Sequence, residues 1–103
     1  MNTNQEVKWE IAKNRIRHLS PQQRKVLCVL YEHPDSCNKE IARYSFITEN
    51  SISVTLASLC DIGIANKYNS DIQGLKNRSF WNITDTDILN ALASNNREIP
   101  NQL

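Results

Sequence analysis

The stretch from Lys39 to Ile64, KEIARYSFITENSISVTLASLCDIGI, decides the fold that we predict for this chain. Residues 39–44 have the composition of a short helix, and a turn is expected at residues 45–47. Thr48 then has the side chain of a helix N-cap, and Gly63 is the residue type that most often follows a helix C-terminus. The sequence therefore predicts two short helices joined by a tight turn.

The second of these helices is expected to have one apolar and one polar side. Ile52, Leu56 and Leu59 recur at i, i+4 and i+7 and form a single apolar stripe. The outward face is expected to carry Asn50, Ser51, Val54 and Ser58, with Ser53 and Thr55 on its flanks. Small hydroxyl and amide groups on an outward face suit close approach to phosphates and base edges. This is the pattern of a helix-turn-helix, which lays its second helix in the DNA major groove.

Length and charge set the limits of this prediction. The chain has 103 residues, which allows one domain with a core of modest size, and its formal net charge is +1. A strong nucleic-acid-binding domain is usually more basic than this. The charge is uneven, however, because Lys67, Lys76 and Arg78 against Asp71 give residues 67–83 a net charge of +2.

The sequence disfavours several other classes of protein and of site. No run approaches the roughly 20 apolar residues of a membrane helix, and no signal-peptide core is present, so we expect no membrane contact and a cytoplasmic location. Cys28 and Cys60 fall inside expected helices and are predicted to be buried thiols. His18 and His33 have no partners at metal-ligand spacing, and two glycines leave no phosphate-binding loop. We therefore expect no metal, no cofactor and no enzymatic activity.

The N-terminal segment, residues 1–19, is expected to be a helix that is apolar on two sides. Trp9 and Ile16 share one face, whereas Val7 and Ile11 lie on nearly the opposite face. Such a helix usually buries two surfaces, and the second partner could be another copy of the chain. We therefore predict a homodimer with Val7, Trp9, Ile11 and Ile16 at its interface. The alternative is a terminal helix with scattered exposed apolar residues.

The rest of the chain predicts one more helix, a hairpin and a C-terminal helix. Ser20, Pro21 and Gln23 form a helix start of the capping-box type. Strands are expected at residues 64–68 and 79–83, joined by a polar, turn-rich tip. The predicted boundaries are 1–19 for the N-terminal helix, 20–83 for the central domain, 84–95 for a C-terminal helix capped by Thr84, and 96–103 for a flexible tail.

In this order the elements resemble the MarR-like winged helix-turn-helix transcriptional regulators. The resemblance covers about residues 5–93 and lies in the order and spacing of several short pieces. They are LSPQQRKVL at 19–27, EIA at 40–42, ITENSISVTLASL at 47–59, DIGI at 61–64 and ITD at 83–85. The resemblance implies a mainly α fold with a small β-hairpin wing, and a dimer on a short palindromic operator.

The resemblance also implies how DNA is contacted. Family members place the recognition helix in the major groove and a wing arginine in the adjacent minor groove, and Arg78 matches that arginine by position. Three departures from the family are a short C-terminal helix, a wing in which Asp71 lies well before Arg78 instead of at the usual D-x-R spacing, and a recognition helix without Arg or Lys.

These observations lead to a set of predicted contacts with double-stranded DNA. Base edges or adjacent phosphates are expected to meet Glu49, Asn50, Ser51, Ser53 and Val54. Phosphates are expected to meet Lys39, Ser58, Lys76 and Arg78. The sequence thus predicts a small dimeric transcriptional regulator of bacterial, phage or plasmid type. Two alternatives stay open: a winged helix that binds a protein as an adaptor or inhibitor, and a replication or partition accessory protein.

Overall fold

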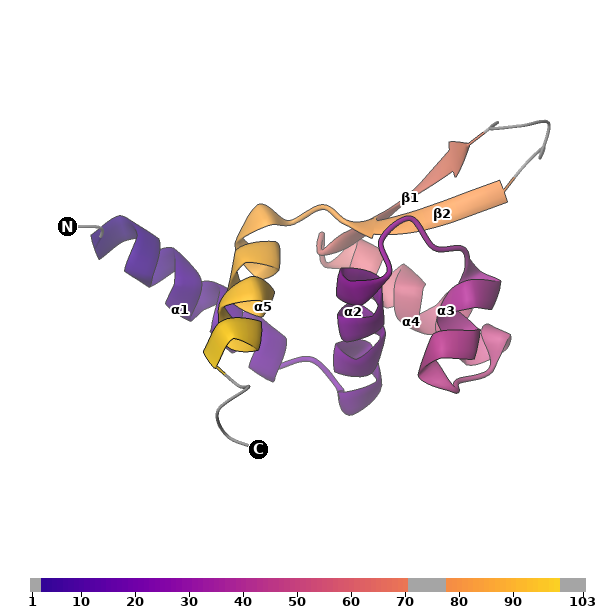
Figure 1. Cartoon of the computed structure of the whole chain (residues 1–103), viewed down its shortest axis with the longest axis horizontal. Coiled ribbons are helices and arrows are strands. Elements are labelled where there is room, and N and C mark those ends of the chain that lie inside the picture. Colours follow the sequence, from indigo (N-terminus) through magenta and orange to yellow (C-terminus); the bar gives the residue numbers. More distant parts are fainter. Residues whose placement is uncertain (1–2, 71–77, 99–103) are drawn as a thin grey trace.

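The computed structural model describes residues 3–70 and 78–98, with side chains described for residues 6–69 and 79–94. Within these ranges the chain forms helices and one β-hairpin (Figure 1). In chain order the elements are α1 (Thr3–Arg17), α2 (Pro21–Glu32), α3 (Asn38–Ser45), α4 (Glu49–Asp61), β1 (Ala65–Ser70), β2 (Arg78–Ile83) and α5 (Thr86–Glu98). This order confirms the predicted mainly α fold with a small β-hairpin.

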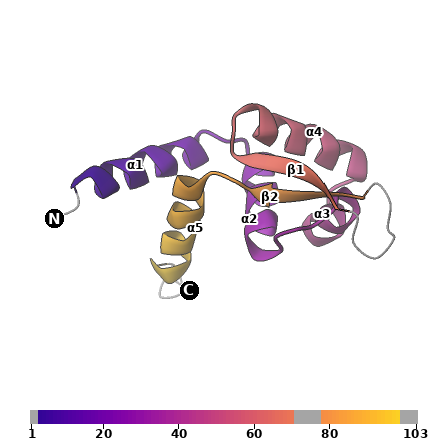
Figure 2. The ribbon, with the colours of Figure 1, turned by 90° about the horizontal axis from the view of Figure 1, so that it is seen from above.

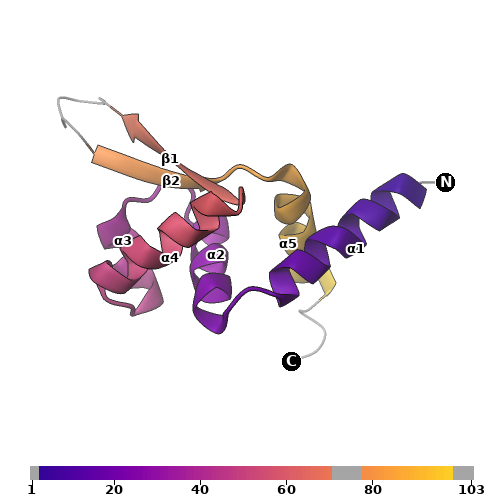
Figure 3. The same ribbon diagram turned by 180° about the vertical axis from the view of Figure 1, so that it is seen from behind.

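The elements form a central cluster of three helices with the hairpin on one side and two helices on the other. The helices α2, α3 and α4 pack against one another, and β1 and β2 lie along their edge (Figures 1 and 3). The helix α1 packs against α5 and extends away from the cluster (Figure 2). The hairpin and the N-terminal end of α1 therefore lie at opposite ends of the molecule.

Local sequence signals account for the predicted helix boundaries. The Oγ atom of Ser20 accepts a hydrogen bond from the N–H of Gln23 at 3.1 Å, and the Oε1 atom of Gln23 accepts one from the N–H of Ser20 at 2.8 Å. This reciprocal pair is the predicted capping box. The Oγ1 atom of Thr48 accepts from the N–H of Ser51 at 3.4 Å and caps α4. Gly63 follows α4 with φ of 81°, in the left-handed region that favours glycine.

The apolar core lies where the three central helices meet and extends to the hairpin and α5. The predicted stripe of Ile52, Leu56 and Leu59 is 0% exposed, so α4 faces the core as expected. The largest fully buried apolar side chains are Val26, Leu27, Leu30, Ile41, Ile52, Leu56, Leu59, Ile64 and Ile88. Among the described side chains, every buried nitrogen or oxygen atom has a hydrogen-bond partner.

The hairpin is antiparallel, and its register decides which residues face the helices. Ala65 lies opposite Ile83, and Lys67 lies opposite Trp81. Because successive strand residues point to opposite faces, Trp81 and its neighbour Phe80 face different sides. Trp81 is buried against the helices, whereas Phe80 is half-buried. One of these two aromatic residues is therefore in the core.

The start and the end of α5 differ from the sequence prediction. The helix begins at Thr86, and the Oδ1 atom of Asp85 accepts the N–H of Ile88 at 3.1 Å, so Asp85 is the cap instead of Thr84. The N–H of Thr84 instead donates to the carbonyl of Ile64. At the other end α5 continues to Glu98, so residues 96–98 are helical and are not part of a tail. Residues 99–103 lie outside the described residues.

The prediction of buried thiols is wrong for two cysteines, because Cys28 and Cys60 are exposed. On α2, the 100° step per residue places Cys28 opposite the face that buries Val26, Leu27, Val29 and Leu30. Partial desolvation, together with the negative charge of Glu32, raises the pKa of the Cys28 thiol above its ordinary value of 9.0. This thiol is therefore in its neutral form near pH 7.

Candidate nucleic-acid interface

The exposed face of α4 carries small polar side chains and one branched apolar side chain. Asn50, Ser53 and Ala57 are exposed, and Val54 is 72% exposed although it is apolar. Residues at this spacing share one side of a helix, opposite the buried stripe. The face therefore presents amide, hydroxyl and methyl groups on short side chains, so another surface can approach the helix backbone closely.

The flank of α4 that faces α2 is occupied by hydrogen bonds within the protein. The Nε2 atom of Gln22 donates to the Oγ1 atom of Thr55 at 2.8 Å, and that of Gln23 donates to the Oγ atom of Ser58 at 2.9 Å. Thr55 is 6% exposed, so the expectation of an exposed flank position is wrong for this residue. Ser58 and Ser51 are half-buried. The phosphate contact of Ser58 stays a prediction, although its hydroxyl already contacts α2.

The loop between α2 and α3 ties the hairpin to the helices. The N–H of Asp35 donates to the Oδ1 atom of Asn82 at 3.0 Å, and the Nδ2 atom of Asn82 donates back to the Asp35 carboxylate at 2.6 Å. The hydroxyl of Tyr68, on β1, donates to the same carboxylate. That hydrogen bond raises the pKa of Tyr68, because the ionised phenol cannot donate it. Asp35 has φ of 61°, a conformation that Asp adopts more readily than most residues.

A second polar connection runs from the hairpin through α3 to α4. The Nε1 atom of Trp81 donates to the Oδ1 atom of Asn38 at 2.7 Å, and the Nδ2 atom of Asn38 donates to the Oγ atom of Ser53 at 3.0 Å. The backbone N–H of Trp81 also donates to the carbonyl of Ser36 at 2.8 Å. Asn38 therefore bridges the hairpin and the exposed face of α4, and it fixes their separation.

An open groove of about 530 Å³ lies between the start of α3, the exposed side of α4 and the hairpin. Lys39 from α3 and Lys67 from β1 contribute cationic groups to its walls, and Glu49 at the start of α4 contributes one carboxylate. The Nζ atom of Lys67 lies 5.9 Å from the centroid of the Trp81 ring, within cation–π range. The described lining thus has two cations against one anion and can attract a negatively charged group.

The structure places most of the predicted contact residues on or beside this groove. Lys39, Glu49 and Ser53 line it, and Asn50 and Val54 lie on the adjoining exposed face of α4. Lys76 lies outside the described residues, and Arg78 begins β2 with its side chain outside them.

Asn38, Lys67 and Trp81 were not among the predicted contact residues. Asn38 and Trp81 are 43 residues apart in the chain, and no local pattern predicts that they meet. Lys67 could have been found from the strand register, because it lies opposite an aromatic residue in a short basic segment.

The N-terminal helix has the two-sided character expected of it. Ala12 is buried at 1% exposure, and Ile16 packs against the core. Trp9 is half-buried. Val7 and Ile11, in contrast, are 52% and 55% exposed in the single chain. One side of α1 is therefore covered by its own chain, and the apolar groups on the other side are open to a partner.

In the part of the chain that the structure describes, no group of three or more His, Cys, Asp and Glu side chains is placed to hold a metal ion. No described helix combines the length and apolar character needed to cross a membrane.

The sequence matches no protein-family model and shows significant similarity to no curated protein. Solved structures, in contrast, share the arrangement of its helices and hairpin. MepR from S. aureus, solved as a complex with DNA, matches with a TM-score of 0.66 at 19% identity, over 92% of this chain and 77% of that one. This chain has the winged helix-turn-helix fold. In this fold α4 takes the place of the recognition helix, and the β1–β2 hairpin takes that of the wing.

Two further winged-helix proteins match at similar levels. PcaV, a transcriptional regulator from Streptomyces coelicolor solved with its natural ligand, has a TM-score of 0.63 at 17% identity, over 87% of this chain and 65% of that one. NMB1585, a MarR family regulator from Neisseria meningitidis, has a TM-score of 0.64 at 16% identity, over 84% of this chain and 61% of that one. The chain thus spans less than two thirds of these two proteins. The likeness confirms the predicted MarR-like winged-helix fold.

Proposed function

We propose that this protein is a sequence-specific DNA-binding transcriptional regulator that acts as a homodimer in the cytoplasm of a bacterium, or is encoded by a phage or plasmid. The observation that carries the proposal is the exposed face of α4, with its short polar side chains, beside a groove that holds two lysines. The shared fold with MepR, which was solved on DNA, supports it.

In the proposed complex, α4 lies in the major groove with the first half of its exposed face toward the bases. The amide of Asn50 can pair with adenine through two hydrogen bonds, and the methyl groups of Val54 can contact a thymine methyl. Glu49, Ser51 and Ser53 meet base edges or the nearest phosphates. Because these side chains are short, the helix backbone lies close to the base edges.

The groove between α4 and the wing is proposed to receive the phosphates of one strand. When α4 is in the major groove and the wing is over the adjacent minor groove, the strand that separates these two grooves has to cross between them. Lys39 and Lys67 line that path. Lys76 and Arg78 are proposed to extend these phosphate contacts along the wing, with Arg78 in the minor groove.

The homodimer is proposed to form through α1. Val7 and Ile11 are apolar and more than half exposed. They belong to α1, which extends to the end of the molecule opposite the hairpin (Figure 2). Association through this end leaves both α4 helices free to contact DNA. Two such helices can read half-sites about one helical turn apart, roughly 34–36 Å.

The proposed function is tested by selecting duplexes from a random-sequence library with the purified protein and measuring their affinity over a range of salt concentrations. DNA binding through phosphates gives log K that falls linearly with log salt concentration. Selection of a palindromic sequence supports the dimeric regulator. If the protein enriches no sequence and has no salt-sensitive affinity for any duplex, the proposal is wrong.

Specific observations also favour a second candidate function, a winged helix that binds a protein partner. The helix α4 contains no Lys or Arg, and the net charge of the chain is +1. Phe46, in the turn before α4, is 91% exposed, and Val54 is 72% exposed. This function would be supported if the unaltered protein bound no duplex but bound a partner protein. Folded Asn50→Ala or Val54→Ser variants should then lose that partner. A replication or partition accessory protein would contact DNA in the same way as the proposed regulator. It would differ in where on the DNA its binding site lies.

A further inference from the structure

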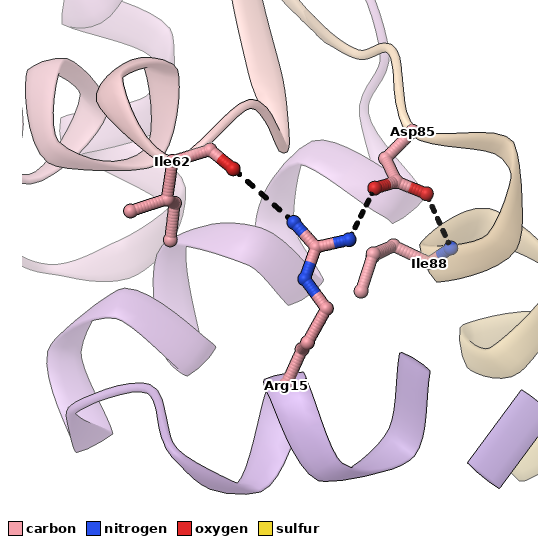
Figure 4. A network of polar contacts seen from close by, with 4 residues as sticks. All are labelled: Arg15, Ile62, Asp85 and Ile88. Carbon is pink, nitrogen blue, oxygen red and sulfur yellow. Dashed lines mark hydrogen bonds and ion pairs between the residues drawn. The ribbon is translucent and has the colours of Figure 1, made fainter. Parts of the chain in front are cut away.

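A single arginine side chain joins the N-terminal helix to the ends of two other helices. The Nη1 atom of Arg15, on α1, lies 2.6 Å from the Oδ2 atom of Asp85, which precedes α5. The Nη2 atom of the same guanidinium donates to the carbonyl of Ile62 at 3.1 Å, at the end of α4 (Figure 4). Among the described residues, these are the hydrogen bonds that α1 side chains make to residues outside α1.

Each of these contacts is made at a helix terminus. The carbonyl of Ile62 lies at the C-terminal cap of α4, where backbone carbonyls lack partners within the helix and the helix dipole favours a cation. Asp85 accepts the N–H of Ile88 in the first turn of α5 and also binds Arg15. Burial raises the pKa of Asp85, but the hydrogen bonds from Ile88 and Arg15 outweigh this effect and lower the pKa below 3.8. The pair is therefore charged near pH 7.

The geometry of this junction restricts how α1 can turn relative to α4. The side chains of Arg15 and Asp85 are 38% and 17% exposed, so the ion pair is partly shielded from water and from salt. A planar guanidinium that binds two acceptors in different directions has little rotational freedom. The orientation of α1 is thus tied directly to the end of α4, in addition to the packing of α1 against α5.

We infer that Arg15 is a positioning residue that fixes the angle between α1 and α4, and thereby the spacing of DNA half-sites that the dimer accepts. The inference rests on the proposed function, since it requires a dimer joined through α1. In such a dimer, a small change of angle at Arg15 is multiplied along the molecule into a larger change in the separation of the two α4 helices. Arg15 then acts on spacing and contacts no base.

The direct test measures the separation of the two α4 helices in the dimer without DNA. Cys60 is exposed near the end of α4 and can carry a spin label after Cys28 and Cys37 are replaced by Ser. Pulsed electron paramagnetic resonance then gives the distribution of distances between the two labels. Arg15→Gln is expected to broaden and shift this distribution. The matched control is Arg17→Gln, because Arg17 bonds only to Asn14 on its own helix among the described residues.

The second test uses the half-site selected by the unaltered protein. Two copies are placed in duplexes whose half-site separation is increased or decreased one base pair at a time. The unaltered protein and Arg17→Gln are expected to prefer one separation, and Arg15→Gln is expected to lose that preference while keeping its affinity for a single half-site. Asp85→Asn keeps the cap on α5 and removes the charge that pairs with Arg15. It should therefore lose the spacing preference as well, and it provides the test if Arg15→Gln folds poorly.

The outcomes separate the two proposals. If the unaltered protein selects DNA as a dimer, but folded Arg15→Gln and Asp85→Asn keep the same label distances and spacing preference, the inference about Arg15 is wrong and the proposed function stands. Should the unaltered protein be a monomer or select no duplex, both proposals fail. A lower unfolding free energy with unchanged distances would also count against positioning, because it is what a purely stabilising ion pair gives.

Discussion

The substitution Asn38→Asp separates the structural role of Asn38 from the charge of the groove. Asn38 accepts a hydrogen bond from Trp81 and donates one to Ser53. An aspartate can still accept from the Trp81 indole, and its second oxygen can accept from the Ser53 hydroxyl, so both connections survive. Because residue 38 is the first residue of α3, a negative charge there also suits the helix dipole by about 0.3–1 kcal/mol. We expect the free energy of unfolding to change by less than about 1 kcal/mol.

The effect on DNA affinity should be much larger than the effect on stability. The new carboxylate lies in the groove that is proposed to receive phosphates. Two unit charges about 4 Å apart repel by about 1 kcal/mol in bulk water and by about 4 kcal/mol at the effective dielectric constant of a protein surface. Even the lower value reduces affinity about fivefold, and the loss should apply to every duplex sequence. Higher salt should reduce the difference from the unaltered protein, because the repulsion is screened.

The assay is a fluorescence titration of the selected duplex at several salt concentrations, together with urea unfolding of each variant. Asn90→Asp is the matched control, since it makes the same charge change at an exposed position of α5, away from the groove. Asn38→Leu removes both hydrogen bonds without adding charge and should lower stability by about 1–3 kcal/mol. If Asn38→Asp is folded and binds DNA as tightly as Asn90→Asp, phosphates do not enter the groove and the proposed docking is wrong.

Four further predictions concern the face of α4, the N-terminal helix, Asp85 and the wing. Asn50→Ala should reduce specific binding by about 1–3 kcal/mol and leave non-specific binding nearly unchanged, because the lost contact is to a base; equal losses on both kinds of duplex would contradict the base contact. Ile11→Glu should convert the dimer to a folded monomer, because a charge would then lie in the apolar interface; sedimentation of an intact dimer would place the interface elsewhere. The lowered pKa of Asp85 means that its ion pair stabilises the fold above pH 3.8 and that this stabilisation is lost as the pH falls through the lowered value. Urea unfolding of Asp85→Asn should therefore show a weaker loss of stability between pH 5 and pH 3 than the unaltered protein shows, and parallel pH profiles would remove the ion pair as a contributor. Arg78→Ala should weaken binding to all duplexes and lower the salt slope by about one unit, and an unchanged slope would mean that this residue does not contact phosphate.

The helix-turn-helix could be predicted because its signals are local. The stripe of Ile52, Leu56 and Leu59 follows from the period of the α-helix, and all three residues are fully buried. The cap at Thr48 and the glycine after α4 depend on side chains within a few residues of each helix end. The same reasoning predicted the wrong cap for α5. Thr84 and Asp85 are both good caps, and the choice between them depends on Ile64 and Arg15, which are distant in the sequence.

The exposure of the predicted contact residues could be foreseen where helix periodicity defines a face, but not where tertiary contacts define a surface. Asn50 and Val54 are exposed as expected, because a residue opposite a buried stripe faces solvent. Thr55 is buried instead, since a glutamine of α2 reaches across to it. The groove, and the place of Lys67 in it, depend on how the hairpin lies against α3 and α4.

The sequence by itself thus determined the order of the helices and strands, the buried face of α4 and the two-sided character of α1. These features follow from side-chain periodicity and from caps, which act within one or two helical turns. Only the tertiary structure decided how the hairpin lies against the helices, through Asp35 and Asn38, and how α1 is joined to the end of α4 through Arg15. Each of those contacts joins residues between 15 and 70 positions apart. Their hydrogen bonds depend on the directions of whole helices, which local pattern does not set.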